Sequence, residues 1–195
     1  TGKTAAFVLP MIEELYKKVD PENRVLRALV IVPTRELAMQ ISRAISNYSR
    51  HLDIKHTEVF GGVSHKEQIR KINNGVDILI ATPGRLIDHL ENNLIDLSAV
   101  QTLVIDEADT MLDMGFLKEI EAILPLCSPT RQISMFSATF SQNVKKLAKE
   151  FLRSPVVIQI HDARDSVDII EHEIYKVDLL KKKEMLSFLI GTKNL

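Results

Sequence analysis

The chain has 195 residues, of which 45% are hydrophobic and 26% charged, and its formal net charge is −1. This composition is typical of a globular protein with one full core and part of a second. The balanced charge excludes a strongly basic protein, so any nucleic acid must be bound by local groups. The single cysteine, Cys127, excludes an internal disulfide and fits a reducing compartment. With no run of transmembrane length and no signal peptide, we expect a cytoplasmic protein without a membrane partner.

Helix-like and strand-like patterns alternate along the chain, which predicts an α/β fold with a mainly parallel sheet flanked by helices. The first helix, residues 3–18, contains Pro10, where we expect a kink instead of a break. Short apolar runs predict strands at 27–32, 57–60, 76–81, 100–105, 132–136 and 156–160. Further helices are expected at 35–49, 64–73, 85–91, 117–126 and 142–151.

A polar, charged stretch near the carboxyl end predicts a domain boundary. We place a first domain at residues 1–162, a linker at 163–168 and the beginning of a second unit at 169–195. Within that unit, the alternation of residues 169–177 predicts a strand, and residues 179–190 have an apolar helical face. A lone strand and helix bury little surface, so we expect this unit to be mobile and the folded core to run from about Arg27 to Ile160.

Three carboxylates follow the strand that ends at Ile105. Asp106, Glu107 and Asp109 lie within four residues of one another, and such a cluster is costly unless a cation neutralises it. Ligands of open α/β sheets bind at the carboxyl ends of the strands. Magnesium, held by one or two carboxylates and a substrate phosphate, would suit this place. The alternative is that these acids only cap the next helix and stabilise its positive end.

The first residues, Thr1-Gly2-Lys3-Thr4, precede an apolar helix. Gly-Lys-Thr at a helix start is the second half of a phosphate-binding loop, in which the lysine reaches the β- and γ-phosphates and the Thr4 hydroxyl binds magnesium. Many helices begin with such residues, so the pattern alone is weak. Together with Asp106 and Glu107 it predicts a site that hydrolyses a nucleotide.

Six motifs in order give the chain a specific resemblance. They are Gly-Lys-Thr at 2–4, P-T-R-E-L-A at 33–38, Gly-Gly at 61–62, T-P-G-R at 82–85, D-E-A-D at 106–109 and, closing the series, S-A-T at 137–139. With them the chain resembles a DEAD-box ATP-dependent RNA helicase, in its first RecA-like (P-loop NTPase) domain. The resemblance implies that an adenine-reading motif lies before residue 1, and that residues 169–195 begin the second RecA-like domain of the same chain.

The resemblance implies ATP and Mg²⁺ as ligands. The phosphate-binding set would be Thr1, Gly2, Lys3 and Thr4. Thr4 and Asp106 would hold the metal, the latter through water, and Glu107 would orient and deprotonate the attacking water. Catalysis would therefore depend on Glu107, Asp106 and Lys3. Coupling between hydrolysis and RNA strand separation would run through hydrogen bonds among Asp109, Ser137, Ala138 and Thr139.

The remaining motifs all follow predicted strands and would form one RNA-binding surface. Its implied members are Pro33, Thr34, Arg35, Gly61, Gly62, Thr82, Pro83, Gly84 and Arg85. Glycine backbone, hydroxyl groups and two arginines are suited to contacts with phosphates and sugars. The set contains no group that would stack on the bases and read them, which predicts sequence-independent binding of the RNA backbone. The alternatives are turns that need positive φ at the glycines and an ion pair between Arg35 and Glu36.

Two other functions stay open: a DNA-directed motor of the same superfamily and an RNA clamp that does not hydrolyse ATP. Ala108-Asp109 disfavours the first, because many DNA-directed relatives carry histidine in place of Asp109. Intact Lys3, Asp106 and Glu107 disfavour the second. Since half of the phosphate loop and an arginine finger would lie outside these residues, we expect the 195 residues alone to be inactive. The six histidines show no metal-ligand spacing and are expected at the surface.

Overall fold

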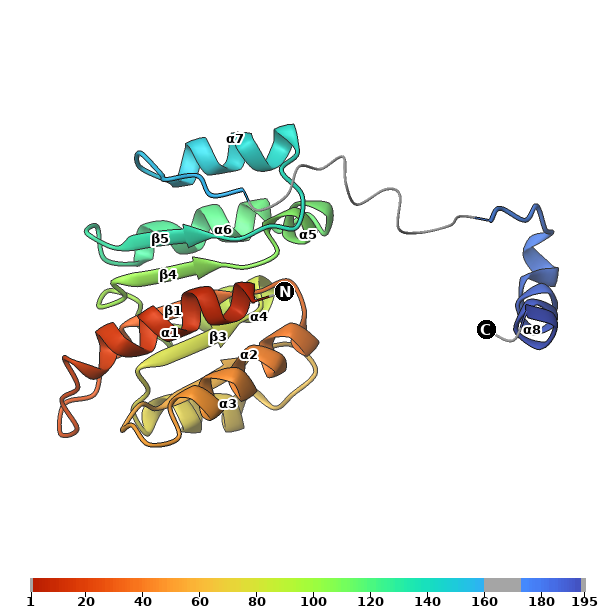
Figure 1. The fold of residues 1–195 in the computed structure, drawn as a ribbon. Coiled ribbons are helices and arrows are strands. Elements are labelled where there is room, and N and C mark those ends of the chain that lie inside the picture. The colour runs from red at the N-terminus through yellow and green to blue at the C-terminus, as the bar shows by residue number, and fades with distance from the viewer. Residues whose placement is uncertain (1, 160–172, 194–195) are drawn as a thin grey trace. The chain divides into compact units, whose positions relative to one another are not determined.

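The computed structural model describes residues 2–159 and 173–193. The chain divides into two compact units, residues 1–156 and 157–195 (Figure 1). In the described part of the second unit, a short 3-10 helix η3 (Leu179–Lys181) leads into helix α8 (Lys182–Lys193), and no side chain of α8 is buried. The functional motifs all belong to the first unit.

A parallel five-stranded sheet forms the centre of the first unit. Its strands are β1 (Ala28–Ile31), β2 (His56–Val59), β3 (Ile78–Ala81), β4 (Thr102–Ile105) and β5 (Gln132–Met135), in the order β2-β3-β1-β4-β5. The register aligns the last residues of β1, β3 and β4, namely Ile31, Ala81 and Ile105. Loops that follow these strands therefore meet at one edge of the sheet. The predicted α/β fold with a mainly parallel sheet is confirmed.

Helices cover both faces of the sheet (Figure 1). They are α1 (Lys3–Tyr16), α2 (Arg35–Tyr48), α3 (His65–Asn73), α4 (Pro83–Glu91), α5 (Ala108–Asp113), α6 (Leu117–Ile123) and α7 (Gln142–Phe151). Alternate residues of the central strands enter two cores: Val30 packs with the side chains of α1 and α2, and Leu29 with those of α4 and α6. Each such buried side chain contributes about 1.5–3 kcal/mol, so both faces hold the sheet in place.

Helix α1 belongs to the folded core. It continues through Pro10 and buries Phe7, Val8, Met11, Ile12 and Leu15. These residues repeat at the three- and four-residue spacing of one helix face. The expectation that the core begins near Arg27 was wrong, because this apolar face packs on the sheet.

Two predicted strands, 156–160 and 169–177, are not found among the described residues, which do not include residue 160. Residues 156–159 form no strand, and Val156 and Ile158 are 88% and 83% exposed. Residues 173–177, the described part of the predicted strand 169–177, form none either, and 169–172 lie outside the described residues. An apolar run becomes a strand only when a neighbouring strand offers backbone partners, and the pattern alone does not report that.

Other boundaries moved by a few residues. The short helix α5 was not predicted, and α6 ends at Ile123, where a 3-10 turn η1 (Leu124–Leu126) contains Pro125.

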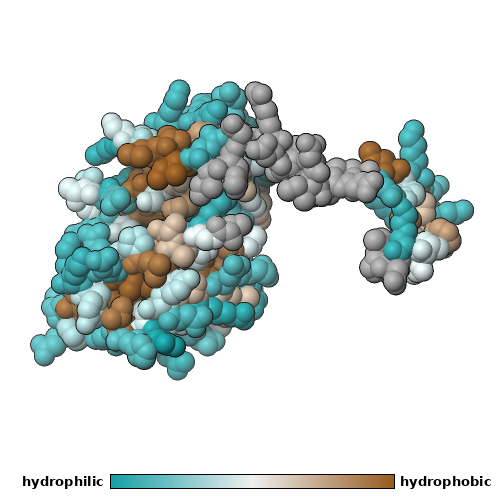
Figure 2. Space-filling model, in the orientation of Figure 1, coloured by the Kyte–Doolittle hydropathy of each residue, from teal (hydrophilic) through white to brown (hydrophobic). Residues whose placement is uncertain are grey.

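Apolar side chains form several patches among polar ones on the face shown in Figure 2, and Leu9, Tyr16 and Tyr48 are each about half exposed. Within residues 2–159 and 173–193, no helix has both the length and the apolar character needed to cross a bilayer.

Candidate active site and nucleic-acid surface

The three acids after β4 form what we call the carboxylate edge: Asp106, Glu107 and Asp109. Asp106 is 5% exposed, and its Oδ1 accepts a hydrogen bond of 3.0 Å from the Glu107 backbone N–H. Glu107 has φ 53° and ψ 52°, the left-handed conformation that costs a non-glycine residue about 1–2 kcal/mol. Ala108 N–H donates to the Phe136 carbonyl at 3.0 Å, which ties this turn to the end of β5. Backbone strain of this kind concentrates at functional sites.

The carboxylate edge is short of positive charge. Burial raises the pKa of Asp106, and the neighbouring Glu107 and Asp109 raise it further. The hydrogen bond from Glu107 N–H and the Lys3 ammonium lower this pKa, but they do not outweigh burial. A cation bound beside Asp106 would relieve this cost.

The donors at this edge suit magnesium more than a metal held by protein alone. Within the described residues, no three His, Cys, Asp or Glu side chains converge as a metal cage. Magnesium keeps several waters and takes only one or two carboxylates together with substrate phosphates. Asp106 and the hydroxyl of Thr4, which is half-buried in the first turn of α1, supply the oxygen atoms that it prefers.

Lys3 connects the beginning of α1 to the end of β5. Its Nζ donates a hydrogen bond of 2.9 Å to the Ser137 carbonyl, across 134 positions of sequence. Gly2, just before it, has φ 77°, which L side chains rarely adopt. The structure therefore brings Lys3 to the carboxylate edge, as predicted. Thr1 lies outside the described residues.

Asp109 and Thr139 form the hydrogen bonds predicted for the S-A-T motif. Both the backbone N–H and the hydroxyl of Thr139 donate to Asp109 Oδ2, each at 2.9 Å. Burial raises the pKa of Asp109, but these two bonds and others from Ser137 and Thr110 bring it below its usual range. The Ser137 hydroxyl donates to the Thr139 carbonyl at 2.7 Å, and Ala138 is exposed. The contacts are confirmed, while the coupling role of these residues stays a prediction.

The other motif residues form the loop surface, defined as Thr34, Arg35, Gly61, Gly62, Thr82, Gly84 and Arg85. Thr34 caps α2, its hydroxyl accepting from Leu37 N–H at 3.2 Å. Arg35 is exposed, its guanidinium carbon 5.0 Å from the centre of the Phe60 ring. It forms no ion pair among the described residues, so the pairing with Glu36 is not found. Thr82 precedes α4, so two helix N-termini, favourable places for anions, adjoin this surface.

The glycines of the loop surface differ in what the fold requires of them. Gly62 has φ 80°, and Arg35 Nη1 lies 3.7 Å from the place of a Cβ atom there. The turn interpretation therefore holds for Gly62. Gly61 and Gly84 have no positive φ, and an added Cβ would meet no atom within 4 Å. Neither needs to be glycine for the fold, so the close approach of a ligand becomes the better interpretation for both.

Arg85 and the two prolines of these motifs are largely shielded from solvent. The Arg85 side chain is 10% exposed, with Nη1 donating to the Val63 carbonyl at 2.9 Å and Nε 3.7 Å from Asp88 Oδ2. Pro33 and Pro83 are buried. Arg85 thus holds the loop after Gly62, and we interpret all three residues as supports of the surface more than as contacts for a phosphate.

One buried contact beside the loop surface was missed. His89, expected at the surface, is fully buried, and its Nε2 lies 3.2 Å from Gln68 Oε1. Gln68 Nε2 donates to the Phe60 carbonyl at 2.9 Å, just before Gly61. Burial lowers the pKa of His89, and the charges of His65 and Arg85 lower it further. The available signal was the place of His89 three residues after Leu86, on the apolar face of α4.

The sequence model of the DEAD/DEAH box helicase family matches residues 1–147. The chain is 42% identical over 192 residues to the DEAD-box ATP-dependent RNA helicase RhpA of Helicobacter pylori, covering 98% of this chain and 38% of that protein. It is 40% identical over 177 residues to the RNA helicase CrhR of Synechocystis, covering 91% of this chain and 35% of that protein. The chain thus spans about a third of these relatives.

Solved structures agree. The yeast DEAD-box splicing factor Prp28 superposes with a TM-score of 0.72 at 36% identity, over 78% of this chain and 37% of that chain. A hypothetical ATP-dependent RNA helicase from Sulfolobus tokodaii gives 0.69 at 40% identity, over 78% of this chain and 43% of that chain. These likenesses confirm the predicted RecA-like fold, and the match to the family model extends over three quarters of the sequence. The chain belongs to the DEAD/DEAH box helicase family, with the motif in its D-E-A-D form.

Proposed function

We propose that this chain is part of an ATP-dependent RNA helicase, in which ATP hydrolysis is coupled to RNA binding and local duplex unwinding. The observation that carries the proposal is the place of Lys3: it is bonded to the Ser137 carbonyl and lowers the pKa of Asp106, at the edge of the sheet that also holds Glu107 and Asp109. The helicases RhpA and CrhR support it, since they are named as ATP-dependent or RNA helicases.

The residues of the carboxylate edge would act by position and charge. Lys3 would leave the Ser137 carbonyl and bind the β- and γ-phosphates, with Gly2 and Thr4 beside it. Glu107 would orient the attacking water and accept its proton. Magnesium, held by Asp106 and the Thr4 hydroxyl, would neutralise phosphate charge when bound. Thr1 completes the predicted phosphate-binding set.

The loop surface would bind the RNA backbone without reading its sequence. The exposed Arg35 supplies charge, and the helix N-termini after Thr34 and Thr82 supply N–H groups. Gly61 and Gly84 leave space for close approach of a phosphate or sugar. Asp109, Ser137 and Thr139 would transmit the state of the nucleotide site to this surface, because Ser137 also accepts the Lys3 hydrogen bond.

We further propose that residues 169–195 begin a second RecA-like domain, which would close the nucleotide and RNA sites. We also propose a cytoplasmic location, because Cys127 is a free thiol, as is usual in a reducing compartment.

The test is ATP turnover in a chimera in which this chain replaces the matching part of the Helicobacter pylori relative. Turnover is measured with oligouridine RNA, with oligothymidine DNA and without polymer. We expect stimulation by RNA alone. Equal stimulation by DNA would favour a DNA-directed motor, and RNA binding without turnover in any condition would favour a non-catalytic clamp.

A further inference from the structure

The outer edge of β2 is open. This strand ends the sheet order and pairs only with β3 among the described residues. Its bonds to β3 use alternate residues: the Lys55 carbonyl accepts from Ile78 N–H at 3.2 Å, and the Val59 carbonyl from Thr82 N–H at 2.9 Å. By this two-residue period, the backbone N–H and C=O groups of His56 and Glu58 face outward. Such an edge can pair with an extended peptide.

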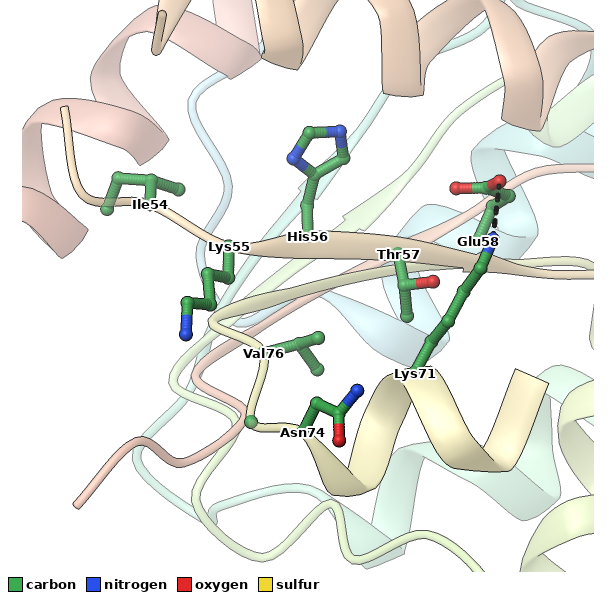
Figure 3. Close-up of a pocket in the computed structure, with 9 residues that line it drawn as sticks. Ile54, Lys55, His56, Thr57, Glu58, Lys71, Asn74 and Val76 are labelled. Atoms are coloured by element: carbon green, nitrogen blue, oxygen red, sulfur yellow. Dashed lines mark ion pairs between the residues drawn. The ribbon is translucent and has the colours of Figure 1, made fainter. Parts of the chain in front are cut away.

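A hollow lies beside this edge. It has a volume of about 530 Å³ and is bounded by β2 and the end of α3 (Figure 3). Its lining residues are Ile54–Glu58, Lys71 and Asn74–Val76. Thr57 is 3% exposed, yet its Oγ1 is a buried atom without a hydrogen-bond partner in the described part of the chain. A buried hydroxyl without a partner is unfavourable, so a ligand that supplied a partner would gain affinity.

The charges around the hollow favour an acidic ligand. Lys55 and Lys71 are exposed, and Lys55 forms no ion pair within residues 2–159 and 173–193. The single carboxylate, Glu58, already accepts a hydrogen bond of 3.2 Å from the Ser42 hydroxyl on α2. The rim therefore carries more positive than negative charge, and its complement is a carboxylate.

Lys71 lies across the open edge. Figure 3 shows its side chain running from α3 over β2 to Glu58, and Nζ is 3.8 Å from Glu58 Oε1. Both side chains are partly exposed, and ion pairs of this kind contribute little to stability. A peptide carboxylate can therefore take over Lys71 at little cost, since Glu58 keeps its bond to Ser42.

We propose that the edge of β2 binds an extended, acidic peptide segment of a partner protein, which adds to the sheet as one more strand. The peptide backbone pairs with the outward groups of His56 and Glu58. Its carboxylates meet Lys55 and Lys71, and a small side chain with a hydroxyl covers Thr57. None of these residues belongs to the carboxylate edge or the loop surface, so binding here leaves the nucleotide site free.

The test is a titration of the ¹⁵N-labelled 195-residue chain with the blocked peptide Thr-Glu-Val-Glu-Thr-Glu-Val, followed by NMR. We expect the amide signals of His56 and Glu58 to shift and their hydrogen exchange to slow, with those of Arg35 and Gly62 unchanged. A peptide with proline at alternate positions lacks the required N–H groups and should not bind. A peptide with lysine for glutamate should bind at least about 10-fold more weakly.

Charge variants locate the site. Lys55→Glu and Lys71→Glu should each weaken binding about 2–5-fold, the range for exposed ion pairs. Lys66→Glu, an exposed lysine of the same helix α3 outside the hollow, is the matched control and should bind as the unchanged chain does. Unshifted core amides, such as that of Leu29, verify the fold of each variant.

Three outcomes overturn the proposal. The amides of His56 and Glu58 do not respond to millimolar acidic peptide; or the lysine peptide binds equally well; or Lys66→Glu weakens binding as much as Lys55→Glu. If oligouridine RNA shifts these two amides and the peptide does not, the edge binds nucleic acid, and the peptide site is excluded.

Discussion

The carboxylate edge and the loop surface lie on the same sheet but are built in opposite ways. At the carboxylate edge, the charge of Asp106 is buried and incompletely neutralised, and Glu107 is held in the left-handed conformation. At the loop surface, the exposed charge of Arg35 lies beside helix N-termini and glycine backbone, while Arg85 is bonded to the fold itself. At the carboxylate edge, the free protein bears an electrostatic cost that a bound ligand can relieve. The loop surface instead offers backbone groups that are already placed for contact with a ligand.

This difference indicates a division of labour. Side chains that bear an energetic cost in the free protein are suited to a reaction, because ligand binding and the transition state recover that cost. A surface of backbone donors at little strain is suited to binding a repeating ligand at any register. Changes in the first region should therefore alter turnover, and changes in the second should alter affinity.

The largest expected effect is on turnover. In the chimera, Glu107→Gln should keep ATP binding and lower hydrolysis by about 10²–10⁴, the usual contribution of a positioned general base. Glutamine keeps the size of the side chain but cannot accept the proton. Turnover is measured at saturating ATP and RNA, and nucleotide binding with a fluorescent ATP analogue. Near-normal turnover would remove Glu107 from the mechanism.

The two arginines should separate stability from RNA contact. Arg85→Ala leaves the Val63 carbonyl without its donor and should lower the free energy of unfolding by about 1–3 kcal/mol. Arg35→Ala loses a cation–π contact and should cost only about 0.5–1 kcal/mol. It should lower the dependence of RNA affinity on salt by about one unit, with no change in base preference.

Urea unfolding of the chain and RNA titrations of the chimera at several salt concentrations measure these effects. The sequence analysis placed Arg35 and Arg85 alike among the residues that would contact the RNA backbone. An equal drop in salt dependence for the two variants, with no loss of stability in Arg85→Ala, would restore that view.

A smaller effect is expected at Gly62. Its φ of 80° makes Gly62→Ala cost about 1–2 kcal/mol of stability. Gly84→Ala is the matched comparison, because its Cβ would meet no atom and its φ is not positive. Gly84→Ala should retain full thermal stability and yet weaken RNA binding in the chimera. Unchanged RNA affinity in Gly84→Ala would mean that no ligand approaches there.

One substitution at the carboxylate edge should raise the stability of the chain. Burial raises the pKa of Asp106, so its charged form costs stability, and that cost appears as pH rises from the ordinary aspartate pKa through the raised one. Asp106→Asn should therefore stabilise the chain at pH 7 by about 0.5–2 kcal/mol, while the amide oxygen still accepts from Glu107 N–H. Melting temperatures of both proteins should converge as pH falls toward 4. A less stable variant at pH 7 would contradict this electrostatic account.

The charge of Asp109 should have the opposite effect on the stability of the chain. Hydrogen bonds from Thr139 lower its pKa against the effect of burial, so the stabilisation that it provides is present above the ordinary aspartate pKa. This stabilisation is lost as pH falls through the lowered pKa of the folded state. Asp109→Asn should therefore destabilise the chain at pH 7, by about 1–3 kcal/mol. Thermal melts of both variants at pH 7 show whether Asp106→Asn raises the stability and Asp109→Asn lowers it.

The sequence predicted those features of the fold and the site that depend on local chemistry. The strand-end positions of Asp106 and Arg35 follow from apolar runs and their order, because parallel strands gather their carboxyl ends. The sequence did not predict contacts that depend on packing, such as Arg85 with Val63 or His89 with Gln68. Strands 156–160 and 169–177 were predicted where the described residues contain none, since a strand needs a partner that its own pattern does not reveal. The left-handed Glu107 had no local signal either.

The most direct test compares turnover and RNA affinity in one experiment. The chimera, its Glu107→Gln variant and its Arg35→Ala variant are assayed for the maximal rate of ATP hydrolysis and for the RNA concentration at half-maximal rate. We predict that Glu107→Gln lowers the maximal rate at unchanged RNA affinity, and that Arg35→Ala raises the half-maximal RNA concentration at unchanged maximal rate. If both variants lower both quantities alike, the carboxylate edge and the loop surface do not divide reaction from binding.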